Sequence, residues 1–273
     1  MIFVSKLKSN IKFYSRHYPF MRKFLAKIWH KGKWKAQQYY FRHNYPEVTL
    51  YSANYSFDQS IANKYRSQFG QDRIINKMLN IDQGFFVDVG ANDPEFINNT
   101  FFFEKYRCWS GIAIEPLSIH ATAWQKYRPN TLLVSCVVGD ITGEAEFIHI
   151  EPESGWEDTL SGLKQKVREE DLNINHKIIK VPMRTLSSIL TESGVVNIDL
   201  LSIDVEGSEM MVLRGLDFNS IRPKIILCEN TAGLFGSEEI RNYLKDNEYR
   251  FFGRVWTADD IFIDEKYYDH INK

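Results

Sequence analysis

The sequence predicts an α/β protein whose sheet is Rossmann-like, mostly parallel and finished by an antiparallel hairpin, preceded by a basic helical arm. The sheet is indicated by short apolar runs that alternate with helical patterns from residue 69 onward. The hairpin is indicated by the last two apolar runs, because their connection is too short for a parallel crossover. The arm is indicated by its charge, since residues 1–46 contain 11 Lys and Arg and not one Asp or Glu.

Two regions of different composition define the expected domains. All 35 Asp and Glu residues lie beyond residue 46, although the net charge of the chain is only −1. With 273 residues and 44% apolar content, the chain can bury one sizeable core and a small appendage. We therefore expect an arm at 1–55 and a main domain at 56–273. Residues 151–180 are polar and too long for an ordinary connection, so we expect a lid-like insertion there, although a surface excursion without function would look the same.

The elements of the main domain follow from their apolar patterns. Helical patterns separate runs that are short enough to be buried strands. The predicted parallel strands are 85–89, 111–114, 131–138, 199–205 and 224–229, the hairpin strands are 249–255 and 260–264, and the helices are 98–105, 118–127, 208–215 and 237–247.

The basic arm contains a predicted helix. Pro19 suits the first turn, and apolar residues from Phe20 to Trp29 recur at spacings of three and four. Gly32 suits the end of that helix. A cationic amphipathic helix of this kind can lie on an anionic membrane surface, and it can equally pack its apolar stripe on the main domain.

Charge and hydropathy exclude several functional classes. A nucleic-acid partner is not expected, because the acidic main domain would repel phosphate. No stretch approaches the roughly 18 apolar residues of a membrane span, and no apolar secretory core follows the first lysines. We therefore expect a cytoplasmic protein, with peripheral contact at the inner face of the membrane through residues 1–46 as an option. Cys108, Cys136 and Cys228 lack paired-ligand spacing and are expected to be reduced core residues, not disulfide or zinc ligands.

The strongest motif is FFVDVGAND, residues 85–93. An apolar strand ends in Asp88, and Gly90 makes a turn in which the backbone can approach a ligand without a Cβ in the way. A dinucleotide site would place further glycines where Asn92, Asp93 and Pro94 stand. The turn therefore suits a cofactor without phosphates, and acidic groups suit the positive charges of S-adenosylmethionine.

Three further strands bring polar groups to the same end of the sheet. Glu115 ends the strand GIAIEP, where a carboxylate can accept hydrogen bonds from both ribose hydroxyls. Cys136 and Val137, in LLVSCVV, offer backbone groups and an apolar wall for adenine, although a structural role fits them as well. Asp204 and Glu206 end the strand DLLSIDVEG, and unpaired buried carboxylates there are hard to explain by packing.

The motifs FVDVGAN, CWSGIAIEP, LLSIDVEGSEMMVLRG and PKIILCEN together resemble the FkbM family of methyltransferases over roughly residues 67–255. The segment SQFGQDRIINKML resembles the beginning of this domain in many bacterial members. The resemblance implies a class I methyltransferase sheet and S-adenosylmethionine-dependent O-methylation, often of sugars in cell-surface or secreted glycans and sometimes of natural products. Pro94 and Glu95 depart from the family, where many members have glycine. The implied cofactor-binding residues are Gln68, Gly70, Asp88, Gly90, Asn92, Glu115, Pro116, Cys136, Val137 and Asp204.

Methyl transfer to a sugar hydroxyl requires a base that takes the proton of the hydroxyl. The catalytic candidates are Asp204, Glu206 and Glu229, with Glu209 and His149 further out. Three carboxylates can also hold a magnesium or calcium ion, although no spacing identifies a metal site. The expected partner is a carbohydrate or glycolipid acceptor, and Trp156, Phe235 and Trp256 are candidates to stack on sugar rings or to be core residues.

Three alternative functions remain open at this point. The chain can be a methyltransferase of small natural products, a nicotinamide-dependent oxidoreductase, or a catalytically silent glycan-binding module. The missing third glycine and the terminal hairpin argue against the oxidoreductase. Retention of Asp88, Glu115 and Asp204 together argues against the silent module.

Overall fold

The computed structural model describes residues 19–52, 64–151 and 157–271, and it describes side chains at 31–52, 64–151 and 157–268. The chain divides into two compact units, Met1–Val48 and Thr49–Lys273. The expected boundary near residue 55 lies outside the described residues. No helix among the described residues is both long enough and apolar enough to cross a membrane.

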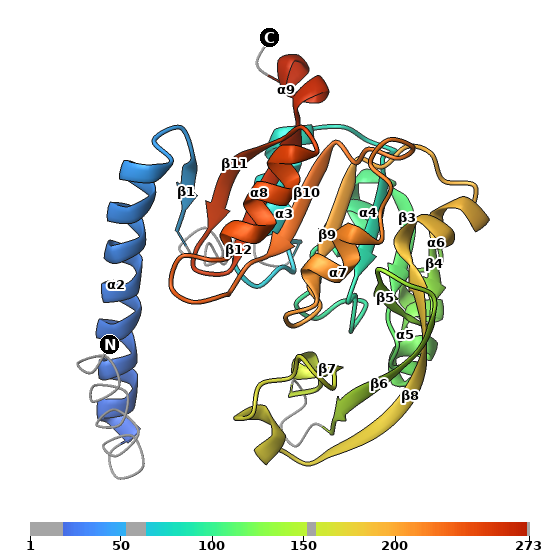
Figure 1. Cartoon of the computed structure of the whole chain (residues 1–273), viewed down its shortest axis with the longest axis horizontal. Coiled ribbons are helices and arrows are strands. Elements are labelled where there is room, and N and C mark those ends of the chain that lie inside the picture. Colours follow the sequence, from blue (N-terminus) through green and yellow to red (C-terminus); the bar gives the residue numbers. More distant parts are fainter. Residues whose placement is uncertain (1–18, 53–63, 152–156, 272–273) are drawn as a thin grey trace. The chain divides into compact units, whose positions relative to one another are not determined.

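The described part of the first unit contains a long helix, α2, which spans Pro19–Asn44 (Figure 1). The helix begins at Pro19, as the sequence predicts. The predicted end at Gly32 is wrong, because α2 continues through Gly32 for 12 further residues. A glycine inside a helix costs only about 1 kcal/mol relative to alanine, and the following segment is rich in good helix formers. Arg42 and His43 occupy the last turn, where positive charge interacts favourably with the negative end of the helix dipole.

The second unit contains a twisted sheet with the order β1-β11-β12-β10-β9-β2-β3-β4. Every neighbouring pair is parallel except the two pairs that β12 makes, with β11 and with β10. The α/β fold and the antiparallel hairpin are therefore confirmed, but β1 covers the outer edge of the hairpin and was not predicted. The strands are β1 Thr49–Tyr51, β2 Phe85–Val89, β3 Ser110–Ile114, β4 Thr131–Val134, β9 Leu200–Ile203, β10 Ile225–Glu229, β11 Tyr249–Val255 and β12 Asp259–Asp264.

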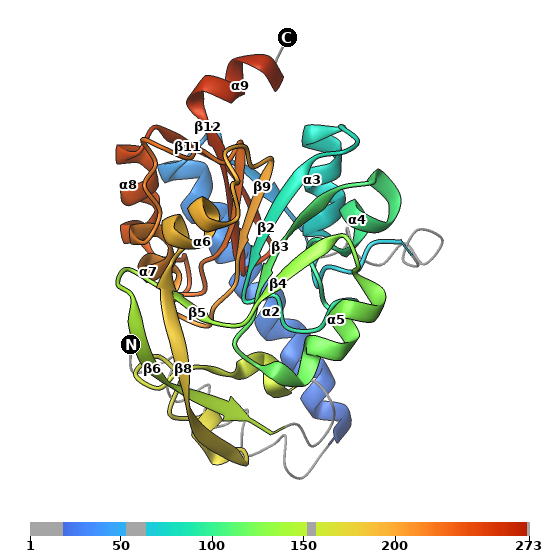
Figure 2. The same cartoon turned by 90° about the vertical axis from the view of Figure 1, so that its right-hand side faces the viewer.

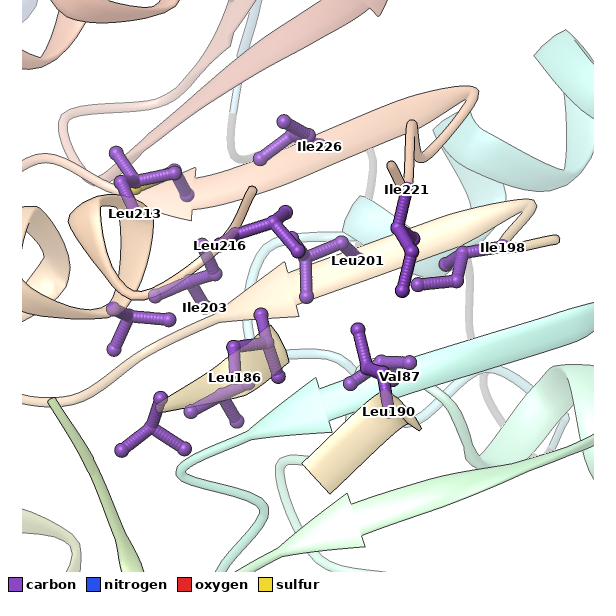
Figure 3. Packing of buried hydrophobic residues seen from close by; sticks show 14 of the residues in the cluster. Val87, Leu186, Leu190, Ile198, Leu201, Ile203, Leu213, Leu216, Ile221 and Ile226 are labelled. Carbon is purple, nitrogen blue, oxygen red and sulfur yellow. The ribbon is translucent and has the colours of Figure 1, made fainter. Parts of the chain in front are cut away.

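Helices cover both faces of this sheet, so consecutive strand residues are buried on opposite sides. On one face Val87, Leu201 and Ile226 pack against helical residues such as Leu186, Leu190 and Leu213 (Figure 3). On the other face Phe86, Leu200 and Ile225 pack with residues of α3 and α4. The helices are α3 Gln71–Leu79, α4 Phe101–Arg107, α5 Ala121–Tyr127, α6 Leu186–Glu192, α7 Glu209–Arg214, α8 Glu238–Asp246 and α9 Glu265–Ile271.

A smaller sheet, with the order β5-β8-β6-β7, is formed by the chain between β4 and β9 of the main sheet. Its strands are β5 Val137–Gly139, β6 Gly143–Ile150, β7 Gly162–Leu163 and β8 His176–Thr185, with short 3₁₀ turns η3 Glu157–Leu160 and η4 Asp171–Asn173. The predicted single strand 131–138 is therefore wrong. The chain turns at Cys136, whose N–H donates to the carbonyl of Val134, and the second half of the run leaves the main sheet.

The expected insertion at 151–180 overlaps this small sheet. Its last residues belong to β8, which pairs with β6 over the full length of β6. Figures 1 and 2 show β6 and β8 as a long ribbon beyond the end of the main sheet, with β7 beside it. The insertion is therefore partly a β-ribbon and not only a polar loop.

Candidate active site

The carboxyl ends of β2, β3 and β9 border a cavity of about 530 Å³, which we call the larger cavity. Ligands of open parallel sheets commonly bind at this end of the strands. The lining from the strand ends and the turns that follow them includes Gly90, Asn92, Glu115, Pro116, Cys136, Val137, Asp204, Glu206 and Ser208. The small sheet and the insertion contribute Phe147, Asp158, Thr159, Ser161 and Leu163.

Gly90 is required by the main sheet itself. Its φ of +80° lies in the left-handed region, and a Cβ at this position would lie 1.8 Å from the carbonyl oxygen of Asp204. The sequence motif predicted that Gly90 lets the backbone approach a ligand. The structure adds a second reason, because β2 and β9 approach each other too closely for any side chain.

Glu115 is held in place by backbone donors. Its Oε2 accepts from the N–H of Asn92 at 2.9 Å, and its Oε1 accepts from the N–H of Leu117 at 2.8 Å. Burial raises the pKa of Glu115 to about 6, against the two backbone hydrogen bonds that lower it. The carboxylate is thus fixed at the strand end, and each oxygen keeps a lone pair for a further donor.

Part of the cavity wall is apolar. Cys136 and Val137 are buried and line the cavity together with Phe147 and Leu163 from the small sheet. Gly162 in β7 lies against the base of the Glu206 side chain, since a Cβ on Gly162 would be 3.6 Å from the Cβ of Glu206. The insertion therefore forms part of the wall of the larger cavity, beside one of the catalytic candidates.

The three predicted catalytic carboxylates meet at the ends of β9 and β10. Oxygen atoms of Asp204, Glu206 and Glu229 all lie within 4.8 Å of one another. Glu206 has a φ of +51°, which turns the chain sharply after β9 and allows its side chain to join the group. Three negative charges at this spacing require a bound proton or a cation, because like charges disfavour ionisation.

The protonation behaviour of this group follows from its surroundings. Asp204 lines both cavities, and dehydration by the surrounding protein, followed by the charge of Glu206, raises its pKa well above the ordinary range. Burial and the charge of Asp204 do the same for Glu229. Burial raises the pKa of Glu206 to about 7, with Arg168 opposing and Glu209 adding to the shift. The group therefore holds protons near neutral pH and can exchange them.

A second, more polar hollow of about 280 Å³ lies on the other side of Asp204, and we call it the smaller hollow. Its lining consists of Gln68, Gln71, Ile97, Asn99, Asp204, Glu229, Ala258 and Asp259. Gln71 donates to Asp259 at 2.7 Å, and burial raises the pKa of Asp259 to about 7. Asp204 lines both spaces, so a group in the larger cavity and a group in the smaller hollow would meet at this carboxylate.

Three of the predicted cofactor residues lie elsewhere. Asp88 lines neither cavity; its carboxylate accepts from Thr100 Oγ1 at 2.8 Å and interacts with Arg128 and Ser202. Gly70 caps the start of α3 with a φ of +84° and also lines neither cavity. Gln68 lines the smaller hollow. Cofactor contact by these residues stays a prediction.

The remaining candidates lie outside the two spaces. His149 is half-buried in β6, and Glu209 accepts from the N–H of Gly207 at the start of α7. Phe235 and Trp256 are partly buried and line neither space, and Trp156 lies outside the described residues. Of the cysteines, Cys136 and Cys228 are buried as expected, whereas Cys108 is exposed.

Sequence reasoning missed several lining residues. Asp158, Thr159 and Ser161 come from the polar insertion, where no apolar pattern marks them. Asn99 and Asp259 come from segments without a motif of their own. For Asp158, Thr159 and Ser161, the only signal in the sequence was the expectation that the insertion forms a lid-like element.

The comparison with solved structures finds distant methyltransferases. A TehB-like S-adenosylmethionine-dependent methyltransferase from Corynebacterium glutamicum is 10% identical, with 76% of this chain and 93% of that chain covered and a TM-score of 0.39. A precorrin-6y C5,15-methyltransferase from Geobacter metallireducens is 10% identical over 74% and 90%, with a TM-score of 0.36. A Burkholderia thailandensis 1,6-didemethyltoxoflavin-N1-methyltransferase with bound S-adenosylhomocysteine is 9% identical over 77% and 82%, with a TM-score of 0.37. These likenesses are too distant to carry conclusions about the site.

The family comparison is decisive. A search among curated proteins found no match. The model of the methyltransferase FkbM domain matches residues 88–251, which is more than half of the chain. The matched segment runs from the end of β2 into β11 and contains Glu115, Asp204, Glu206 and Glu229. The chain therefore belongs to the FkbM family of S-adenosylmethionine-dependent methyltransferases.

Proposed function

We propose that this methyltransferase acts on a hydroxyl group of a sugar, in a bacterial cell-surface glycan or glycolipid. The observation that carries the proposal is the position of Asp204, which lines both the larger cavity and the smaller hollow. A methyl donor in the first space and a hydroxyl in the second would be brought together beside a carboxylate. Such alignment is the main requirement of an in-line methyl transfer.

The larger cavity fits the cofactor. Glu115 presents a fixed carboxylate that suits the ribose hydroxyls, and Cys136 and Val137 form an apolar wall that suits adenine. Ser208, which is 2% exposed, lines the same cavity, and its hydroxyl has no hydrogen-bond partner among the described residues. A polar ligand would satisfy that hydroxyl. When bound, S-adenosylmethionine supplies an activated methyl group on a positively charged sulfur.

The smaller hollow favours a hydroxyl-rich acceptor. Its polar side chains are amides and carboxylates, which accept and donate several hydrogen bonds to neighbouring hydroxyl groups. Ile97 adds one apolar surface, which suits the carbon face of a sugar ring. A flat, apolar natural product would leave these polar groups without partners, at a cost in binding.

The carboxylate group supplies the base. We assign the base to Glu206, with Asp204 and Glu229 as the alternatives, because burial raises the pKa of Glu206 to about 7 and a base works best near the ambient pH. In this scheme Glu206 takes the proton of an acceptor hydroxyl that reaches Asp204, and the raised pKa values of Asp204 and Glu229 allow these carboxylates to share the proton. The same three carboxylates would suit a divalent cation that polarises the hydroxyl.

The proposal is tested by mass spectrometry of surface glycans from cells with and without the gene. We expect loss of a single methyl group, a mass difference of about 14 Da, from one sugar of the glycan. In parallel, the purified protein is incubated with S-adenosylmethionine and the demethylated glycan, and S-adenosylhomocysteine is measured. Unchanged glycans together with turnover on small aromatic hydroxyl compounds would contradict the sugar assignment and support a natural-product acceptor.

The basic arm fits this proposal if the glycan is built on a lipid carrier. Each Lys or Arg near an anionic membrane surface contributes about 1 kcal/mol to binding. We expect the full chain to sediment with vesicles containing anionic lipid, and a variant with Arg22, Lys23, Lys27 and Lys31 changed to Gln to stay in the supernatant. Equal sedimentation of the two proteins would refute a membrane role for the arm.

A further inference from the structure

His120 and Asp158 form an ion pair between two parts of the second unit. His120 ends the turn η2, Ser118–His120, directly after β3, and Asp158 lies in η3 of the insertion. The ring Nε2 of His120 lies 2.9 Å from Oδ2 of Asp158. The side chains are 13% and 7% exposed, so the pair is screened from water far more than a surface ion pair.

The pair adjoins the residues that would bind the cofactor. Asp158 lines the larger cavity and also accepts a hydrogen bond from the side chain of Asn92. Asn92, in turn, donates its backbone N–H to Glu115. The segment from Asp158 to Leu163 thus reaches the cavity through contacts with two loops at the strand ends, one after β2 and one after β3.

The electrostatic surroundings of His120 favour its protonated form. Three carboxylates from three separate elements face it: Asp158 in η3, Glu115 at the end of β3 and Asp93 in the loop after β2. Burial acts against protonation, but the hydrogen bond and the charge of Asp158 outweigh it, so the pKa of His120 lies above its ordinary value. The same pair lowers the pKa of Asp158, although its burial acts in the other direction. The protonated form of His120 and the ionised form of Asp158 therefore stabilise each other.

We propose that His120 is a positioning residue that holds the insertion, through Asp158, as a wall of the cofactor cavity. This inference rests on the assignment of the larger cavity to S-adenosylmethionine. Without the pair, Asp158 would keep its contact with Asn92, but the wall would have one attachment fewer beside Glu115. Cofactor affinity would then fall, whereas the carboxylates at the ends of β9 and β10 would stay in place.

Binding of S-adenosylhomocysteine, measured by calorimetry on the full chain, tests the proposal without an acceptor. We expect His120→Ala and Asp158→Ala each to weaken binding about tenfold. The double variant should also bind S-adenosylhomocysteine about tenfold more weakly than the wild type, with no further loss, because both changes remove the same contact. His176→Ala is the matched control in the insertion; His176 contacts the carbonyl of Ile174 and does not line the cavity, so its affinity should stay within about twofold of wild type.

The pH dependence separates a charged tether from simple packing. A raised pKa of His120 means that the attachment is fully present below about pH 6.5 and is lost as the pH rises through the raised value. The neutral variant His120→Gln keeps a donor but cannot titrate, so the ratio of wild-type to variant affinity should fall as the pH rises above about 6.5.

The outcomes are distinguishable. If the wild type does not bind S-adenosylhomocysteine, the cofactor assignment itself is wrong. If the wild type binds and His120→Ala and Asp158→Ala bind equally well, the tether is wrong while the proposed function stands. Additive losses in the double variant, or an affinity ratio for His120→Gln that does not change with pH, would likewise overturn the role of the ion pair.

Discussion

The larger cavity and the smaller hollow share Asp204 but are built in different ways. The larger cavity takes most of its polar groups from turns that directly follow β2, β3 and β9, and it fixes Glu115 with two backbone hydrogen bonds. The smaller hollow collects side chains that are spread from Gln68 to Asp259. Backbone-defined sites tolerate sequence change, whereas side-chain-defined sites change with single substitutions. In the proposed function the larger cavity is the cofactor half and the smaller hollow is the acceptor half, so we expect single substitutions to change acceptor binding more readily than cofactor binding.

The strongest test of this division is Glu206→Gln, because Glu206 lines the larger cavity and its carboxylate lies within 4.8 Å of those of Asp204 and Glu229, which line the smaller hollow. Removal of a general base lowers kcat by about 10² to 10⁴-fold. Because the change keeps the shape of the side chain, the affinity for S-adenosylhomocysteine should stay within a few-fold of wild type. The measurement is kcat with the acceptor glycan, together with calorimetry of the product.

The pH profile adds a second criterion for Glu206. Burial raises its pKa to about 7, and a base must be deprotonated to act, so kcat of the wild type should rise through about pH 7 and level off above it. The profile of Glu206→Gln should lack this rise. If instead a chelator abolishes wild-type activity and magnesium restores it, the three carboxylates hold a cation and the base assignment is wrong.

Gly90→Ala tests whether the cofactor half depends on backbone geometry. The new Cβ would collide with the carbonyl oxygen of Asp204, and alanine disfavours the positive φ. We expect a loss of about 2–4 kcal/mol in the free energy of unfolding, measured by denaturant titration. Gly194→Ala is the control, because Gly194 also has a positive φ but nothing lies within 4 Å of an added Cβ. Equal losses in both variants would show that the conformation, and not the contact between β2 and β9, requires glycine at position 90.

The sequence placed several residues of the larger cavity correctly because they sit at the ends of apolar runs. A buried strand must be apolar on both faces, so the first polar residues after it mark the strand end. Glu115, Cys136 and Val137 were placed on the cavity from that pattern, and the structure puts them there. Asp88 shows where the argument stops, since position along a strand does not reveal toward which face the side chain points.

The parts that could not be predicted depend on contacts between distant segments. β1 has only three residues and is a strand because it pairs with β11 about 200 positions later. The split of 131–138 into β4 and β5 depends on β8, which offers a second partner to the latter half of the run. Likewise, Asn99 and Asp259 reach the smaller hollow through the packing of the whole unit. Local pattern does not encode such partners.

Glu115→Gln tests the cofactor half with a smaller change. Gln keeps the acceptor at one oxygen and places an amide donor opposite a backbone N–H, so one of the bonds to Asn92 and Leu117 is lost. We expect the affinity for S-adenosylhomocysteine to fall about tenfold and KM for the acceptor to change little. Unchanged cofactor affinity would show that Glu115 only shapes the loop. Glu144→Gln, an exposed residue of β6 outside both spaces, is the matched control.

The smallest expected effect, at Gln68, decides to which half this residue belongs. The family resemblance implied a role for Gln68 with the cofactor, whereas the structure places it in the smaller hollow. Loss of one exposed hydrogen bond by Gln68→Ala should raise KM for the acceptor glycan about three- to fivefold, because a neutral bond contributes roughly 0.5–1.5 kcal/mol. The affinity for S-adenosylhomocysteine should not change. If calorimetry instead shows weaker binding of S-adenosylhomocysteine with an unaltered KM for the acceptor, Gln68 contacts the cofactor. In that case the smaller hollow also belongs, at Gln68, to the cofactor half.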